Sequence, residues 1–90
     1  MPKRIEIEFI GNVHGVGFRY TTQSIARRHP VVGYVKNLPN GNVEVVAEGE
    51  EAALIAFLQE IREKMAYHID REQIAWMEEL GQFKDFRIGG

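Results

Sequence analysis

Three glycines at positions 11, 15 and 17, with an arginine at position 19, follow directly on an alternating segment near the start of the chain. A strand that runs through a glycine-rich turn into a helix exposes several backbone N–H groups at the helix start, where the helix dipole also favours negative charge. Arg19 adds a planar, permanently charged fork that can grip two phosphate oxygens at once. The stretch Gly11 to Arg19 therefore predicts a small anion cradle.

The spacing of these glycines excludes two common phosphate-binding loops. The stretch contains no Gly-x-Gly-x-x-Gly, which a dinucleotide-binding turn requires, and no Lys-Ser or Lys-Thr pair follows the last glycine, as it would in a Walker loop. Any phosphate recognition here must use a different backbone geometry.

The segments on either side of the cradle predict a strand and a helix. Between Arg4 and Ile10, apolar and charged residues alternate with a period of two, which is typical of a strand with one buried face. From Phe18 onward, apolar residues recur on one helical stripe, and Pro30 requires that this helix has already ended. The cradle therefore lies at a junction between strand and helix.

An Asn-Gly pair at positions 40 and 41 separates two strand-like runs, Val32 to Asn37 and Val43 to Glu48. Asn-Gly is the strongest short-range signal for a tight hairpin turn. We therefore expect these two runs to pair as antiparallel strands.

A second helix is predicted to open at Gly49-Glu50-Glu51, with acidic residues in its first turn. Its core-facing stripe comprises Leu54, Phe57, Leu58, Ile61 and Met65. The segment Asp70 to Glu79 favours a fourth strand, although its apolar run is short enough that periodicity alone leaves a helix open. Phe86 and Ile88 indicate a short final edge strand.

This order of elements, strand, helix, strand, strand, helix, strand, is that of a split βαβ fold. The predicted class is α+β, with an antiparallel sheet and both helices packed on one face. No linker or low-complexity segment interrupts the chain, so residues 1–90 are expected to form a single domain.

Composition narrows the possible partners. A content of 44% apolar and 27% charged residues is ordinary for a globular domain and excludes disorder, and a chain without cysteine has neither disulfides nor a thiolate metal site. A formal net charge of −2 disfavours binding to nucleic acid, which usually needs a basic face. No apolar run approaches a membrane span, and the charged first residues are unlike a signal peptide, so we expect a cytoplasmic location. The two helices are expected to cover the apolar surface, which predicts a monomer.

Asn37 stands at the end of a predicted strand, just before the hairpin, where its amide can orient a water molecule. Taken singly, each candidate has an ordinary structural explanation. Asparagine shapes turns, an arginine on the surface forms ion pairs, and glycines form plain turns. The combination of Asn37 with Arg19 and the glycine stretch is what favours a functional site.

Two stretches together carry a family resemblance. Gly11-x-Val13-x-Gly15-Val16-x-Phe18-Arg19 is followed by Gly33-Tyr34-Val35-Lys36-Asn37-x-x-x-Gly41-x-Val43 and then by Gly49. In order, spacing and separation, these stretches closely resemble the two signatures of the acylphosphatase family. The resemblance covers nearly the whole chain.

The resemblance implies a ferredoxin-like α/β sandwich and hydrolysis of the carboxyl-phosphate anhydride of small acyl phosphates, without a metal or organic cofactor. Inorganic phosphate would be the product and a competitive ligand. The resemblance also implies that Arg19 and the loop amides hold the phosphoryl group, while Asn37 places the attacking water. The loop residues in this role would be Gly11, Asn12, Val13, His14, Gly15, Val16 and Gly17.

Position 14 departs from the family pattern, because it carries His where many relatives carry Gln. We hypothesise that His14 modulates activity across mildly acidic pH by gaining a proton near the phosphate, the alternative being a tolerated loop residue that points to solvent. His29 and His68 have no companions at metal-ligand spacing, so no zinc site is expected.

Alternatives remain for one side chain and for the function. Trp76 could line a partner surface, although burial or partial burial on the sheet is favoured. RNA-binding and regulatory modules share the split βαβ fold, but the strands lack the aromatic stacking motif of the RNA-binding module. A domain that has kept the phosphate cradle and lost turnover is the other candidate, and only turnover distinguishes it from an enzyme.

Overall fold

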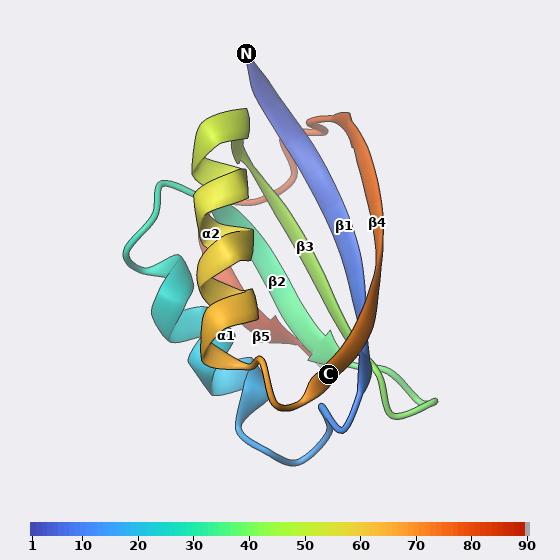
Figure 1. Cartoon of the computed structure of the whole chain (residues 1–90). Coiled ribbons are helices and arrows are strands. Elements are labelled where there is room, and N and C mark those ends of the chain that lie inside the picture. Colours follow the sequence, from blue (N-terminus) through green and yellow to red (C-terminus); the bar gives the residue numbers. More distant parts are fainter. Residues whose placement is uncertain (90) are drawn as a thin grey trace.

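The computed structural model describes residues 1–89, which form one five-stranded sheet with two helices on one of its faces (Figure 1). In chain order the elements are β1 (Pro2–Gly11), α1 (Phe18–Ala26), β2 (Val32–Asn37), β3 (Val43–Glu50), α2 (Glu51–Lys64), β4 (Ile69–Glu78) and β5 (Phe86–Gly89). The strands lie in the order β4-β1-β3-β2-β5. The predicted α+β order is confirmed, and the 70–79 segment is a strand rather than a helix.

The core lies between the helices and the sheet. Ile5, Ile7 and Phe9 alternate along β1 and are buried beneath the helices, as the period of two predicts. The predicted α2 stripe is confirmed, because all five of its residues are buried: Leu54, Phe57, Leu58, Ile61 and Met65. Helix α2 packs over β1 and β3, and α1 over β2 and β5.

One pair of strands departs from the expected antiparallel sheet, because β5 runs parallel to β2. Strand β4 ends beside Lys3, at the same end of the sheet where β2 begins. Residues 79–85 cross the sheet face opposite the helices at that end, so β5 enters alongside β2 in the same direction. The backbone N–H of Gly33 donates to the carbonyl of Asp85 over 2.9 Å and fixes this entry.

The hairpin between β2 and β3 is confirmed, and its loop has three residues. Leu38 and Asn42 close the loop, the Leu38 N–H donating to the Asn42 carbonyl over 2.8 Å. Within it, the Gly41 N–H donates to the Leu38 carbonyl over 3.0 Å, and Gly41 has a φ of 88°. Glycine is suited to this left-handed position at the end of a three-residue loop.

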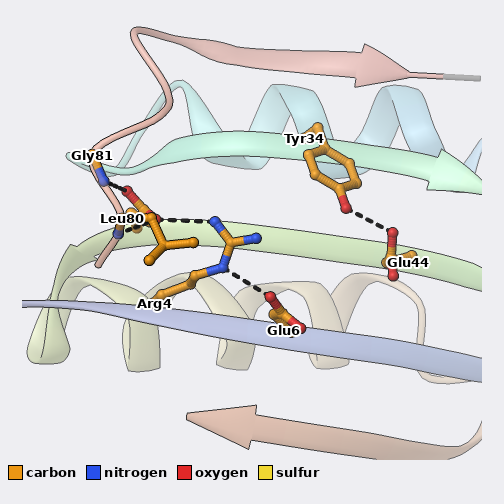
Figure 2. A network of polar contacts seen from close by, with 7 residues as sticks. Arg4, Glu6, Tyr34, Glu44, Leu80 and Gly81 are labelled. Atoms are coloured by element: carbon orange, nitrogen blue, oxygen red, sulfur yellow. Dashed lines mark hydrogen bonds and ion pairs between the residues drawn. The ribbon is translucent and has the colours of Figure 1, made fainter. Parts of the chain in front are cut away.

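The face of the sheet opposite the helices carries a buried polar network (Figure 2). The Arg4 guanidinium on β1 donates to Glu6 over 2.8 Å and to Glu48 over 3.1 Å. Glu48 also accepts hydrogen bonds from the backbone N–H groups of Leu80, over 2.9 Å, and Gly81, over 3.1 Å. The network therefore attaches the 79–85 crossing segment to the sheet.

Candidate active site

The glycine loop between β1 and α1 is attached to the core at both ends. Val13 is fully buried, and Phe18, the first residue of α1, is almost fully buried. The Phe18 ring packs against Phe9 of β1, with 5.1 Å between the ring centroids. These apolar anchors fix the backbone of the loop, while Asn12, His14 and the glycines at 15 and 17 stay exposed.

The glycines of the loop serve two different purposes. Gly15 and Gly17 have φ values of 75° and 77°, and nothing lies within 4 Å of a Cβ added at either position, so their backbone conformation is what requires glycine. Gly11 is needed for space, because an added Cβ would lie 2.5 Å from the His68 carbonyl oxygen and 2.7 Å from the Asp70 nitrogen. Gly11 therefore allows β4 to begin close beside the end of β1.

Helix α1 begins directly after Gly17 and directs its N-terminus at the loop. The helix is joined to the loop by a backbone hydrogen bond, in which the Thr21 N–H donates to the Gly17 carbonyl over 3.0 Å. The backbone N–H groups of the first helical residues have no acceptor within the helix. No acidic side chain lies in the first turn. The free donors and the positive end of the helix dipole favour an anion here.

Arg19 and Asn37 come from different elements and line one cavity with the loop. Asn37 is the last residue of β2 and alternates with buried Val35, so its side chain lies on the helix side of the sheet. Arg19 is half-buried, and no ion pair or side-chain hydrogen bond within residues 1–89 engages its guanidinium. The cavity measures about 220 Å³ and is lined by Val13, Gly15, Gly17, Phe18, Arg19, Tyr20 and Asn37.

The structure brings together only part of the predicted loop set. Of the predicted loop residues, Gly11, Asn12, His14 and Val16 do not line this cavity. Phe18 and Tyr20 do line it and were not predicted as site residues. Tyr20 can be recognised as a site residue only when the start of α1 at Phe18 is known. That start places the Tyr20 backbone in the first helical turn, next to Arg19.

The chemistry of this lining is that of an anion site. None of its residues is acidic, so the Arg19 charge faces no carboxylate inside the cavity. A larger groove of about 570 Å³ lies between the helices, but its Arg28 is paired with Glu60. Volume therefore does not identify the site. An arginine that has no partner within residues 1–89, beside free backbone donors, does identify it.

The remaining histidines lie apart from this cavity. The Nε2 atom of His29 is 2.8 Å from a carboxylate oxygen of Glu60. Within residues 1–89, no three His, Cys, Asp or Glu side chains gather as a metal site would require. In the same residues, no helix is long and apolar enough to cross a membrane. The expected cytoplasmic location stays a prediction.

Comparison with known proteins assigns the chain to a family. The family model for acylphosphatase matches residues 5–88. This chain belongs to the acylphosphatase family. It is 38% identical over 89 residues to the acylphosphatase of Caldanaerobacter subterraneus, covering 98% of this chain and 99% of that protein. It is also 38% identical over 88 residues to the acylphosphatase of Lactobacillus gasseri, covering 96% and 97% of the two chains.

Solved structures agree with the family assignment. The crystal structure of acylphosphatase from Bacillus subtilis matches with a TM-score of 0.90 and 31% identity, covering 98% of this chain and 99% of that one. Full-length HypF, in a phosphate- and nucleotide-bound form, matches all of this chain over 12% of its own length, with a TM-score of 0.86 and 32% identity. The ferredoxin-like fold is thereby confirmed, and the family supports hydrolysis of acyl phosphates.

Proposed function

We propose that this acylphosphatase hydrolyses the carboxyl-phosphate anhydride of small acyl phosphates, holding the phosphoryl group with the Gly11–Gly17 loop and Arg19 and placing water with Asn37. The observation that carries the proposal is the shared cavity, which joins Arg19 and Asn37 to the left-handed glycines of the loop. The cavity offers cationic and N–H donors to an anion and no competing carboxylate.

The phosphoryl oxygens are the groups that the site is equipped to bind. Donors at the start of α1 and the Arg19 fork neutralise negative charge on these oxygens, and this charge is spread over them in the transition state. Because the donors are fixed by the buried anchors Val13 and Phe18, little reorganisation is needed when the substrate binds.

The attacking water would be oriented by the Asn37 amide, whose carbonyl oxygen can accept a hydrogen bond from the water. The water oxygen bonds to phosphorus as the bond from phosphorus to the acyl oxygen breaks, and the carboxylate leaves with that electron pair. A proton of the water passes to a phosphoryl oxygen. Since a carboxylate is a good leaving group, the lining needs no strong general base, and it contains none.

The acyl group is proposed to extend out of the cavity. Arg19, the loop and Asn37 would all act at the phosphoryl end of the substrate. Tyr20, which also lines the cavity, is 70% exposed. Small acyl phosphates of different acyl groups are therefore the proposed substrate class, with inorganic phosphate as product and competitive ligand.

The proposal is tested by hydrolysis of benzoyl phosphate in the presence of a chelator. Arg19→Ala should lower kcat/KM by roughly a hundredfold or more, because removing one well-placed donor costs about 3 kcal/mol of transition-state stabilisation. Arg19→Lys is the matched control, since it keeps the positive charge and loses the planar guanidinium. Its kcat/KM should lie between those of the wild type and Arg19→Ala. Asn37→Ala should lower kcat while inorganic phosphate still inhibits as it does in the wild type.

Two results would contradict the proposal in different ways. Wild-type protein that binds phosphate through Arg19 and turns over no acyl phosphate would be a binding domain that has lost turnover. If Asn37→Ala turned over acyl phosphate as fast as the wild type, the protein would still be an enzyme, but Asn37 would not position the water.

A further inference from the structure

The buried face of α1 carries one polar side chain, that of Thr22. The other buried residues of this helix, Phe18, Ile25 and Ala26, are apolar. Thr22 is fully buried, and its hydroxyl oxygen has no hydrogen-bond partner within residues 1–89. A buried hydroxyl without a partner destabilises a fold, and valine would fill the same space without that cost. The hydroxyl therefore needs an explanation other than core packing.

Helix α1 runs antiparallel to β2, with its first turn beside the last residue of the strand. That turn shares the active-site cavity with Asn37, which ends β2. Farther along the helix, Nε2 of Gln23 donates to the Phe86 carbonyl over 3.3 Å, and Phe86 pairs with Gly33 near the start of β2. Thr22 therefore lies between a point level with Asn37 and a point level with Gly33.

The spacing along the two elements brings Thr22 next to Asn37. From Phe18 to Thr22 the helix rises about 6 Å, and from Asn37 back to Val35 the strand extends about 6.6 Å. Thr22 is thus level with Val35, the inward-facing neighbour of Asn37 on β2. Because helical side chains lean toward the N-terminus of their helix, the Thr22 side chain leans from this level toward Asn37.

The Asn37 side chain also lacks a partner, since none of the side-chain hydrogen bonds within residues 1–89 involves it. The oxygen and NH₂ ends of an asparagine amide have nearly the same shape, so hydrogen bonds decide which end faces the cavity. In the reaction proposed above, the oxygen must face the water. A neighbouring group that accepts a hydrogen bond from the NH₂ end would fix this orientation.

We propose that Thr22 is a positioning residue whose hydroxyl oxygen accepts a hydrogen bond from Nδ2 of Asn37, directly or through one water molecule, and so turns Oδ1 toward the attacking water. The inference rests on the proposed function. Thr22 does not line the cavity, so it acts through Asn37 and not on the substrate. Its own proton can be donated to the Phe18 carbonyl four residues earlier, as threonine commonly does in helices.

The kinetic test is hydrolysis of benzoyl phosphate by Thr22→Val, which keeps the shape of the side chain and removes the hydroxyl. Its kcat should fall about tenfold, because a small displacement of a positioning group slows the chemical step. Inhibition by inorganic phosphate should stay as in the wild type. Thr22→Ser restores a hydroxyl and should recover most of the rate. Ser24→Ala, which removes an exposed hydroxyl from the same helix, is the matched control and should keep the wild-type kcat.

Two further comparisons separate positioning from a structural role. Thr22→Val should unfold at the same temperature as the wild type or higher, since it removes an unpartnered buried hydroxyl. Adding Thr22→Val to Asn37→Ala should slow the enzyme no further, because the hydroxyl acts only through Asn37. A wild-type kcat in Thr22→Val, a loss confined to KM, or a double variant slower than Asn37→Ala would each overturn the proposal.

The contact itself is tested without turnover, by the side-chain amide resonances of Asn37 in ¹H–¹⁵N spectra of the full chain. These resonances are assigned by their absence from the Asn37→Ala spectrum. Thr22→Val should shift them, whereas Thr22→Ser and Ser24→Ala should leave them nearly in place. Unchanged resonances in Thr22→Val overturn the proposal. If the resonances shift and the wild type hydrolyses no acyl phosphate, the contact stands and the proposed function is wrong.

Discussion

Arg4 and Glu48 lie directly opposite each other on β1 and β3, and Nη1 of Arg4 donates to Oε2 of Glu48 over 3.1 Å. Both side chains are nearly buried, at 8% and 2% exposure, although they lie on the face away from the helices. The crossing segment 79–85 covers them, and its Phe83 ring lies 5.4 Å from the Arg4 guanidinium. A buried ion pair therefore joins the two strands to the last part of the chain.

Replacing Glu48 should destabilise the protein strongly at neutral pH. Glu48→Gln removes the buried carboxylate from Arg4 and leaves Glu6 as its remaining ionic partner, and breaking a buried ion pair typically costs about 3 kcal/mol in the free energy of unfolding. The matched control is Glu44→Gln on the same strand, because Glu44 lies in a half-exposed contact with Tyr34 and should lose about 1 kcal/mol or less. Urea unfolding measures both, and equal losses would contradict a special role for the buried pair.

The same pair should make stability depend on acidity. Burial raises the pKa of Glu48, but hydrogen bonds from the Leu80 N–H, Arg4 and the Gly81 N–H outweigh it and hold that pKa below its usual value of 4.5. The stabilisation is therefore complete above about pH 4.5 and is lost as the pH falls through the lower pKa of the folded state. The gap in unfolding free energy between wild type and Glu48→Gln should narrow below that pH, and a constant gap would refute the linkage.

Gly33 should tolerate no side chain. An added Cβ would lie 1.9 Å from the Val46 carbonyl oxygen, and the φ of Gly33 is 151°. Gly33→Ala should therefore lower the free energy of unfolding by roughly 3 kcal/mol or more, since the strand backbone must move. Gly41→Ala is the control, because its φ is 88° and its surroundings are open, so only conformational strain of about 1 kcal/mol is expected. Thermal unfolding of the two variants separates steric clash from strain.

Polar side chains hydrogen-bond the hairpin after Asn37 to β1, and we expect these bonds to help position Asn37 for catalysis. Asn42 Nδ2 donates to Glu8 over 2.6 Å, while the Asn42 carbonyl accepts from Leu38, the residue after Asn37. Asn42→Ala should lower kcat about tenfold with little change in phosphate inhibition, because a small displacement of a positioning group slows the chemical step. Glu8→Gln keeps an acceptor for Asn42 and should retain most activity. A change confined to KM would contradict this prediction.

His14 offers a direct test of pH control. It is exposed and does not line the cavity. If a proton on His14 assists binding of the anion, the pH profile of kcat/KM should differ between wild type and His14→Gln at mildly acidic pH. Superimposable profiles would show that His14 is a tolerated loop residue.

The sequence predicts most of this fold because its signals are local. Alternation along β1, the stripe on α2 and the Asn-Gly turn each depend on residues close together in the chain, and each led to a correct element. Arg19 and Asn37 were selected from compact motifs, and the fold brings them to one cavity.

What the sequence did not predict depends on the segment that crosses the sheet. Alternation marks Arg4 as a solvent-facing residue, and nothing in its neighbourhood indicates that residues 79–85 will cover it. The parallel direction of β5 follows from the same crossing. The exposure of Trp76 depends on the width of the sheet relative to its two helices, which no local pattern reports.

The strand order has a consequence for how the protein is made. Strand β1 is synthesised before the other strands of the sheet, yet its neighbours are β3 and β4, and its Lys3 pairs with Glu78 of β4. The glycine loop and Arg19 are therefore synthesised well before β4, whose first residues lie against Gly11. Pairing over such sequence separations is slow, so the edge of β1 that receives β4 stays unpaired until residues 69–78 have been added, although β1, β3 and β2 can already pair with one another.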